Sequence, residues 1–316
     1  MQNTGSCYHR QMMKINDFIE RANGFLPGNI HNFKLGLISI LLNRSLLIED
    51  VPGMGKTTFV KFLGKSLGLK FNRIQFTSDL LPSDILGVSI YDKESGEFIF
   101  KKGPIFAELV LADELNRGTP KVQSALLEAL EERQVSIDGT TYPLPERFCL
   151  IATQNPRGQF GTYPLPESQL DRFLFKTCMG KLSREEELKL LSENNRSEEI
   201  THLEQMISEE ELRHWKKSIR EVKTSENLLS YILDIVEATR KGSDISGLSP
   251  RATRDLVDAV KGYAFICGRD FVIPDDVQVI FPYVAGHRLY TSQTYSIEQE
   301  QVKARSILSS IKVKPE

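Results

Sequence analysis

The chain has little of what marks secreted or membrane-spanning proteins. Its 316 residues include only four cysteines, which follow neither metal-ligand spacing nor a disulfide pattern. No apolar run approaches the roughly 18 residues of a membrane span, and the longest one, residues 35–42, is interrupted by Gly36 and Ser39. Residues 1–14 are polar, so no signal peptide is expected. These absences predict a protein of the reducing cytoplasm that does not insert into a membrane.

The chain also lacks an excess of either charge. Its 40 basic and 42 acidic residues give a formal net charge of −2, which argues against a general nucleic-acid binder. Hydrophobic residues make up 40% of the sequence, enough for a sizeable core, and the length suggests about two domains. Residues 1–16 are expected to form a disordered extension, with Met12 or Met13 as an alternative start.

A glycine-rich segment, residues 50–57, follows the apolar run 45–48 and precedes the apolar, helix-compatible run 58–63. The order of strand, glycine loop and helix is typical of a phosphate-binding loop, in which backbone N–H groups and the helix N-terminus face the phosphates. Asp50 departs from the strict pattern, which has glycine at this position. The predicted nucleotide-binding residues are Asp50, Gly53, Met54, Gly55, Lys56, Thr57 and Thr58.

Polar residues follow two further apolar runs. The run 109–112 ends in Asp113 and Glu114, and the run 149–153 is followed by Asn155. Strands that are apolar throughout are typical of buried parallel sheets, whose ligands bind beyond the carboxyl ends of the strands. We therefore expect Thr57 and Asp113 to hold Mg²⁺, Glu114 to activate water, and Asn155 to orient that water.

Two arginines complete the predicted site. Arg172 lies in the segment 170–173 and Arg251 follows Ser249 and Pro250. Guanidinium groups stabilise the charge that spreads over a phosphoryl group in the transition state. Each motif alone is weak, but five of them occur in one order, each at the end of its predicted element.

With these motifs, the chain resembles an AAA+ ATPase of the MoxR family from about residue 17 to about residue 288. The segments that carry the resemblance are 50–57, 111–117, 152–156, 161–167, 170–173 and 249–252, with 268–270 and 274–277 fitting the family's lid. The resemblance implies ATP and Mg²⁺ as cofactors and a homo-oligomer, commonly a hexameric ring. It also implies an arginine finger acting across subunits, for which Arg172 is the first candidate and Arg117 the second. Whether Arg251 acts within its own subunit or across the interface stays open.

The fold expected from pattern and resemblance is α/β. An AAA+ phosphate-loop parallel sheet, with helices on both faces and β-hairpin insertions, spans residues 17–180. An all-helical C-terminal lid domain spans 181–316. Turn residues at 92–96 and 138–140 predict two hairpins, which in one AAA+ clade face the central pore or a partner. The alternative is that each hairpin only covers a sheet edge.

The function expected from the resemblance is ATP hydrolysis that drives chaperone-like remodelling or maturation of client proteins. The resemblance also implies a partner with a von Willebrand factor A domain. Two alternatives stay open: a nucleic-acid-associated AAA+ motor, and a nucleotide-switch scaffold that hydrolyses little. The near-neutral composition speaks against the motor, and the presence of both Lys56 and Glu114 speaks against the scaffold.

Overall fold

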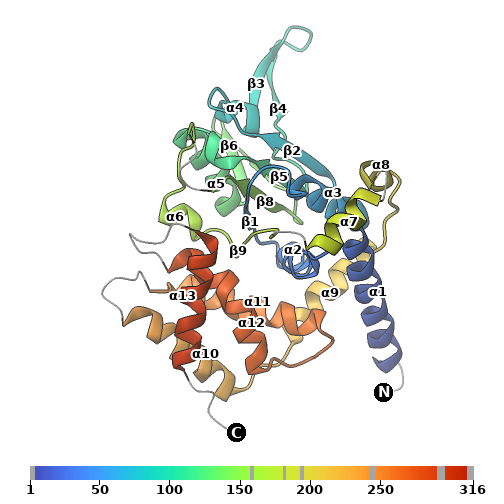
Figure 1. Cartoon of the computed structure of the whole chain (residues 1–316). Coiled ribbons are helices and arrows are strands. Elements are labelled where there is room, and N and C mark those ends of the chain that lie inside the picture. Colours follow the sequence, from blue (N-terminus) through green and yellow to red (C-terminus); the bar gives the residue numbers. More distant parts are fainter. Residues whose placement is uncertain are drawn as a thin grey trace.

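A computed structural model describes residues 4–156, 160–180, 183–192, 196–241, 247–289 and 296–311. At its centre lies a five-stranded parallel sheet with the strand order β2-β5-β8-β1-β9 (Figure 1). Its strands are β1 (Leu46–Glu49), β2 (Phe71–Gln75), β5 (Leu109–Asp113), β8 (Cys149–Gln154) and β9 (Phe175–Thr177). The inner strands β1, β5 and β8 are buried along their whole length, as their unbroken apolar runs predict.

Alternate strand residues feed two separate cores. Leu46 and Ile48 point to the face covered by α2 (Ile30–Leu42) and α3 (Lys56–Ser66), and belong to the larger apolar cluster. Leu47 belongs to the second cluster, on the face covered by α4 (Pro82–Leu86) and α5 (Pro120–Glu132). Helices on both faces confirm the expected fold class.

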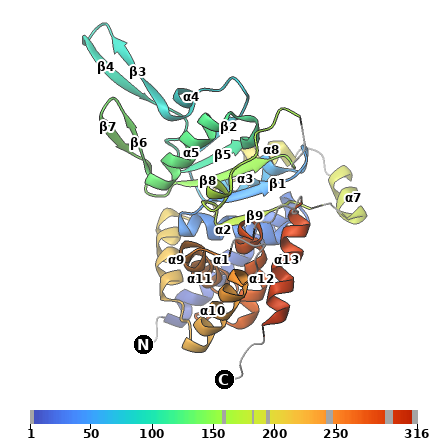
Figure 2. The same cartoon turned by 90° about the vertical axis from the view of Figure 1, so that its left-hand side faces the viewer.

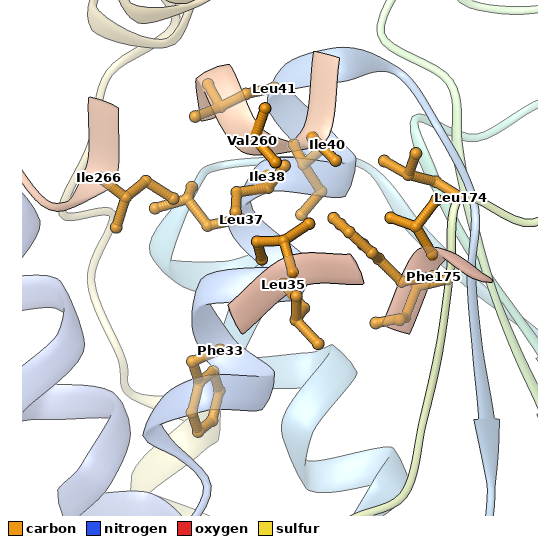
Figure 3. Close-up of a cluster of buried hydrophobic side chains, with 14 of the residues drawn as sticks. Phe33, Leu35, Leu37, Ile38, Ile40, Leu41, Leu174, Phe175, Val260 and Ile266 are labelled. Carbon is orange, nitrogen blue, oxygen red and sulfur yellow. The ribbon is translucent and has the colours of Figure 1, made fainter. Parts of the chain in front are cut away.

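The C-terminal part is helical, as predicted. Its helices from residue 209 on pack beneath the sheet, whereas those within residues 184–201 lie beside it (Figure 2). Its elements are α7 (Arg184–Ser192), α8 (Arg196–Thr201), α9 (Glu209–Glu221), α10 (Glu226–Arg240), α11 (Pro250–Ile266), α12 (Pro274–Ala285) and α13 (Ile297–Ser310). Ser208 and Glu211 match the Ser-x-x-Glu pattern of a capping box and form one at the start of α9, where each side chain is bonded to the other residue's backbone N–H. Helices α2 and α11 join the two parts, since Val260 and Ile266 pack among the buried side chains of α2 and β9 (Figure 3).

The N-terminal extension departs from the expectation. Helix α1 runs from Thr4 to Phe25, so most of residues 1–16 is helical rather than disordered. The physical reason is an apolar stripe that continues toward the N-terminus, with Ile15, Phe18 and Ala22 at helical spacing and almost fully buried.

The two predicted hairpins are present as separate two-stranded antiparallel sheets. They are β3–β4 (Gly87–Asp92 and Glu97–Lys102) and β6–β7 (Gln134–Ile137 and Thr140–Pro143). Both project from one side of the sheet domain (Figure 2), and the rings of Phe100 and Tyr142 stack with centroids 4.1 Å apart. Within the described ranges, neither hairpin pairs with the central sheet.

Two further expectations concern a loop and a membrane span. Gly242 and Gly247 predict a loop between them, of which only Gly247 lies within the described residues. Among the helices that are described, none is both long and apolar enough to cross a membrane.

Candidate active site

The phosphate-binding loop lies between the end of β1 and the start of α3. Gly53 and Gly55 take the left-handed conformation, with φ of +87° and +80°. Gly55 is also required by space, since a Cβ there would lie 2.7 Å from a methyl carbon of Leu26. Helix α3 begins at Lys56, so its N-terminal N–H groups face the loop. Thr57 and Thr58 stand half-buried in the first turn, and a helix N-terminus of this kind is suited to bind an anion.

Lys56 is buried inside this loop. Its Nζ donates to the carbonyl oxygens of Asp50 (2.6 Å) and Val51 (3.3 Å). Burial lowers the pKa of Lys56, while the carboxylates of Asp50, Asp113 and Glu114 act in the opposite direction. Lys56 therefore lies within electrostatic range of the two carboxylates at the end of β5.

Asp50 has a structural task that explains its departure from the glycine pattern. One carboxylate oxygen accepts from the N–H of Val51 at 2.8 Å, and the other accepts from the N–H of Met179 at 3.0 Å. The side chain thus ties the start of the loop to the segment that follows β9. In addition, the backbone N–H of Asp50 donates to Gln154 at the end of β8.

Asp113 ends β5 with both carboxylate oxygens engaged. Oδ1 accepts from the hydroxyl of Thr153 at 2.6 Å, and Oδ2 accepts from Nε and an Nη of Arg73 at 3.0 and 2.6 Å. A carboxylate offers about four lone-pair sites, so these contacts leave room for a cation or its bound water. An oxygen ligand of this kind fits Mg²⁺, which is commonly held by one or two carboxylates together with substrate phosphates. Within the described part of the chain no larger cluster of metal-ligating side chains occurs.

Glu114 takes a left-handed backbone conformation, with φ of +55°, which is uncommon for a residue other than glycine. Its N–H donates to the Thr153 hydroxyl at 2.8 Å, so one buried threonine positions both acidic residues. The Glu114 carboxylate accepts from the side-chain amide of Gln75 at 3.0 Å and from Arg117 at 3.1 Å. Arg117, the second finger candidate, thus faces the glutamate of its own chain.

Asn155 lies directly after β8 and is 5% exposed. Its backbone is held by Asn116, which exchanges two hydrogen bonds with it through its side-chain amide. The side-chain oxygen of Asn155 is buried and has no hydrogen-bond partner among the described residues. A buried polar atom in this position fits a bound water or a phosphate group, depending on which way the amide is turned.

Arg172 and Arg251 come together on one carboxylate, although 79 residues separate them. Arg172 Nε lies 3.1 Å and an Nη of Arg251 lies 2.7 Å from the two oxygens of Glu131, at the end of α5. Neither arginine forms a recorded ion pair with the loop or with Asp113 or Glu114 among the described residues. The structure therefore groups the predicted residues into two sets, one around Lys56 and one around Glu131.

The segment that carries Arg172 is held from the C-terminal part. Arg288, buried in the short 3-10 helix Gly286–Arg288 that follows α12, donates to the carbonyls of Asp171 and Phe173 and to the carboxylate of Asp255. His287 shares the carbonyl of Phe173 at 3.0 Å. Burial lowers the pKa of Arg288, and the carboxylates of Asp255 and Asp171 oppose that shift. These contacts fix the position of Arg172 relative to the helices.

A second buried charge cluster lies beside the loop. Lys176 on β9 is 2% exposed and lies 3.1 Å from a carboxylate oxygen of Glu49, the last residue of β1, and 2.8 Å from one of Glu300 on α13. Gln154 also donates to Glu49. The cluster connects the strand that precedes the phosphate loop to the last helix.

Several of these residues escaped sequence reasoning: Arg73, Gln75, Thr153, Glu131 and Arg288. Thr153 lies inside a predicted strand. The one sequence signal for its role is its position one residue before the end of β8, the strand that pairs with β5 and hence lies near Asp113. The others become recognisable only when the fold brings distant segments together.

The chain matches known proteins over nearly its whole length. Residues 45–175 match a family model described as the ATPase family associated with various cellular activities (AAA), and residues 238–311 match an AAA lid domain. The protein YeaC of Bacillus subtilis is 45% identical over 298 residues, with 93% of each chain covered. Chaperone MoxR1 of Mycobacterium tuberculosis is 38% identical over 285 residues, covering 87% of this chain and 74% of the relative.

A solved structure agrees with these sequence relatives. The crystal structure of a candidate ATPase from Cytophaga hutchinsonii is 36% identical, covers 99% of both chains and superimposes with a TM-score of 0.85. With the AAA and lid segments matched, and MoxR1 related over most of the length, the chain belongs to the MoxR family of AAA+ ATPases.

Proposed function

We propose that the protein hydrolyses ATP to ADP and phosphate at the loop that follows β1. The observation that carries this proposal is geometric. The loop that holds Lys56 follows β1, and Asp113 and Glu114 stand at the end of β5, at the same edge of a parallel sheet in which β8 alone lies between these two strands. Lys56 and the first N–H groups of α3 would hold the phosphates. Glu114 would take a proton from the attacking water, and Asn155 would orient that water.

Mg²⁺ fits the oxygen atoms that the site offers. Thr57 in the first turn of α3 and Asp113 at the end of β5 would hold it, with Thr153 fixing the carboxylate. The metal, when bound, neutralises charge on the phosphate oxygens. The protein's own part is to set the position of these groups before ATP arrives, which lowers the cost of reorganisation during the reaction.

We infer that Arg172 and Arg251 serve the site of a neighbouring subunit in a homo-oligomeric ring, of which a hexamer is the expected form. The support is their joint position on Glu131, in a set separate from the residues around Lys56. A finger supplied by another subunit makes hydrolysis depend on assembly and is worth about 10³–10⁵ in rate in other phosphoryl-transfer enzymes. Arg117, bonded to Glu114 of its own chain, is the weaker candidate.

Our proposal for the biological role is chaperone-like remodelling of client proteins, which the name of the related MoxR1 supports. The β3–β4 hairpin offers exposed apolar side chains for such contacts, since Tyr91 and Phe98 are 57% and 74% exposed. A partner with a von Willebrand factor A domain rests on the family resemblance alone. A nucleic-acid motor remains the second candidate, and salt-dependent DNA binding tests it.

Two variants test the proposed chemistry. Lys56→Ala should lose ATP binding, because the phosphates lose their main side-chain counterion. Glu114→Gln should bind ATP and retain it unhydrolysed, since the amide keeps the size of the glutamate but cannot take a proton. Nucleotide titration and a phosphate-release assay measure the two effects. Equal ATP affinity of Lys56→Ala and wild type, or undiminished turnover of Glu114→Gln, would overturn the assignment.

A further inference from the structure

A second concave site lies at the other end of the sheet. A cavity of about 700 Å³ opens where the turn from α2 to β1 and the end of α5 meet α9 and α11. In Figure 2, α9 lies beneath the sheet on the side from which the hairpins project. Six cationic side chains line the cavity: Arg44, Arg133, Lys216, Arg220, Arg254 and Lys261. The only carboxylate in its lining is that of Asp258.

Two of the six cations are already engaged. Arg44 forms an ion pair with Asp255 at 2.8 Å, and Arg133 donates to the backbone carbonyls of Phe148 and Asn43. The other four, on α9 and α11, form no ion pair with any residue that the structure describes. The cavity therefore holds more positive charge than its own walls compensate.

Both burial and the neighbouring cations act on the pKa of two of these side chains. Burial lowers the pKa of Lys216, and the nearby Arg220 and Arg133 lower it further, with Glu146 opposing them. Burial likewise lowers the pKa of Arg133, and Arg44 adds to that shift. A bound anion would relieve this mutual repulsion.

The cavity is distinct from the ATP site. Arg44 precedes β1 and Phe148 precedes β8, whereas the phosphate loop and Asn155 follow the carboxyl ends of the same strands. The four residues of β1 alone separate the two ends by roughly 13 Å at about 3.3 Å per residue. A ligand in the cavity would thus leave the nucleotide loop free.

We propose that this cavity binds a compact anion carrying several phosphate groups, as a second ligand besides ATP. Six cations face a single carboxylate in this lining, so a ligand there must bring dense negative charge, and each phosphate group brings about 1.5 to 2 negative charges near neutral pH. Guanidinium groups bind phosphate oxygens in pairs, and the volume is that of an ordinary small-molecule site. All six cations line one cavity of limited volume, and the net charge of the chain is −2, which disfavours an extended nucleic acid.

The test uses tripolyphosphate as the probe and the full-length chain carrying Lys56→Ala, so that the nucleotide loop does not contribute. In this background we compare Arg220→Gln/Arg254→Gln with Lys217→Gln/Lys223→Gln. Both pairs are on the surface and remove two charges, but Lys217 and Lys223 lie outside the cavity lining. Thermal unfolding of each variant without the probe verifies that it is folded. Calorimetric titration then measures affinity at 150 mM salt.

We expect the cavity pair to lose about tenfold or more in affinity for tripolyphosphate, because losing two guanidinium groups removes charge-assisted hydrogen bonds to the phosphate oxygens. The control pair should bind as the parent does. Equal affinity in all three proteins would overturn the proposal. So would tighter binding of an acidic peptide or a single-stranded oligonucleotide of equal charge at the same cavity, since either would assign it to a macromolecular partner.

Discussion

Thr153 offers the sharpest test of how the acidic residues are positioned. Among the residues that the structure describes, its hydroxyl is the one side-chain group hydrogen-bonded to both, donating to Asp113 at 2.6 Å and accepting from the N–H of Glu114 at 2.8 Å. Thr153→Val keeps the shape of this fully buried side chain and removes both hydrogen bonds. Thr153→Ser is the matched control, because it keeps the hydroxyl and removes only a methyl group.

The magnitude follows from the two bonds. The bond to the charged carboxylate is worth about 1.5–3 kcal/mol and the bond from a neutral N–H about 1 kcal/mol, so the valine variant should unfold about 2–4 kcal/mol more easily. Displacement of a catalytic group by about 1 Å can cost about 10²-fold in rate, and we expect turnover to fall by that order. ATP affinity should stay near the wild-type value, since Thr153 forms no recorded contact with the described residues of the phosphate loop.

Two assays measure these effects. Urea unfolding can be followed by fluorescence of the single tryptophan, Trp215, which is buried on α9 away from the change. Phosphate release at saturating ATP gives the turnover, and nucleotide titration gives the affinity. The reasoning is refuted if Thr153→Val is as stable and as active as Thr153→Ser.

Three further predictions concern other parts of the molecule. Glu131→Gln should lower turnover by about tenfold at unchanged ATP affinity, because the carboxylate that positions two arginines loses its charge. The control Glu132→Gln, at the exposed end of the same helix, should match wild type in turnover and in ATP affinity. Lys176→Met should cost about 3–5 kcal/mol in denaturant unfolding, since it removes the cation between two buried carboxylates; a loss below 1 kcal/mol contradicts this. Burial lowers the pKa of His31 from 6.5 to about 4, so protonation favours the unfolded chain. The stability of wild type relative to His31→Phe should therefore decline as the pH falls from about 6.5 to about 4, and a constant difference between the two proteins would rule this out.

Much of the fold could be predicted from local pattern. The strands that precede each motif and both hairpins appear where apolar runs and turn residues placed them, and the C-terminal part is helical as expected. Strand β9 was missed because it has only three residues, and the charged Lys176 at its centre breaks the apolar pattern. That lysine is tolerated in the interior because Glu49 and Glu300, from distant segments, compensate its charge.

The candidate site, like the fold, could be predicted only in part. The positions of Lys56, Asp113, Glu114 and Asn155 could be predicted, because each stands at or just after the end of a recognisable strand, where ligands of parallel sheets bind. The meeting of the two arginines on Glu131 could not, because it depends on how the helical part packs against α5. The division of the chain at residue 180 and the individual site roles remain predictions.

The central claim is that ATP is hydrolysed in a site completed by a neighbouring subunit. Mixing Glu114→Gln, which has an inactive pocket and an intact finger, with Arg172→Ala, which has the reverse, tests it most directly. Each variant alone should be nearly inactive while still binding ATP, and co-assembly is verified by mass measurement of the mixed oligomer. The account predicts that phosphate release recovers on mixing, because some intact fingers then face intact pockets. Demonstrated co-assembly without any recovery would contradict it.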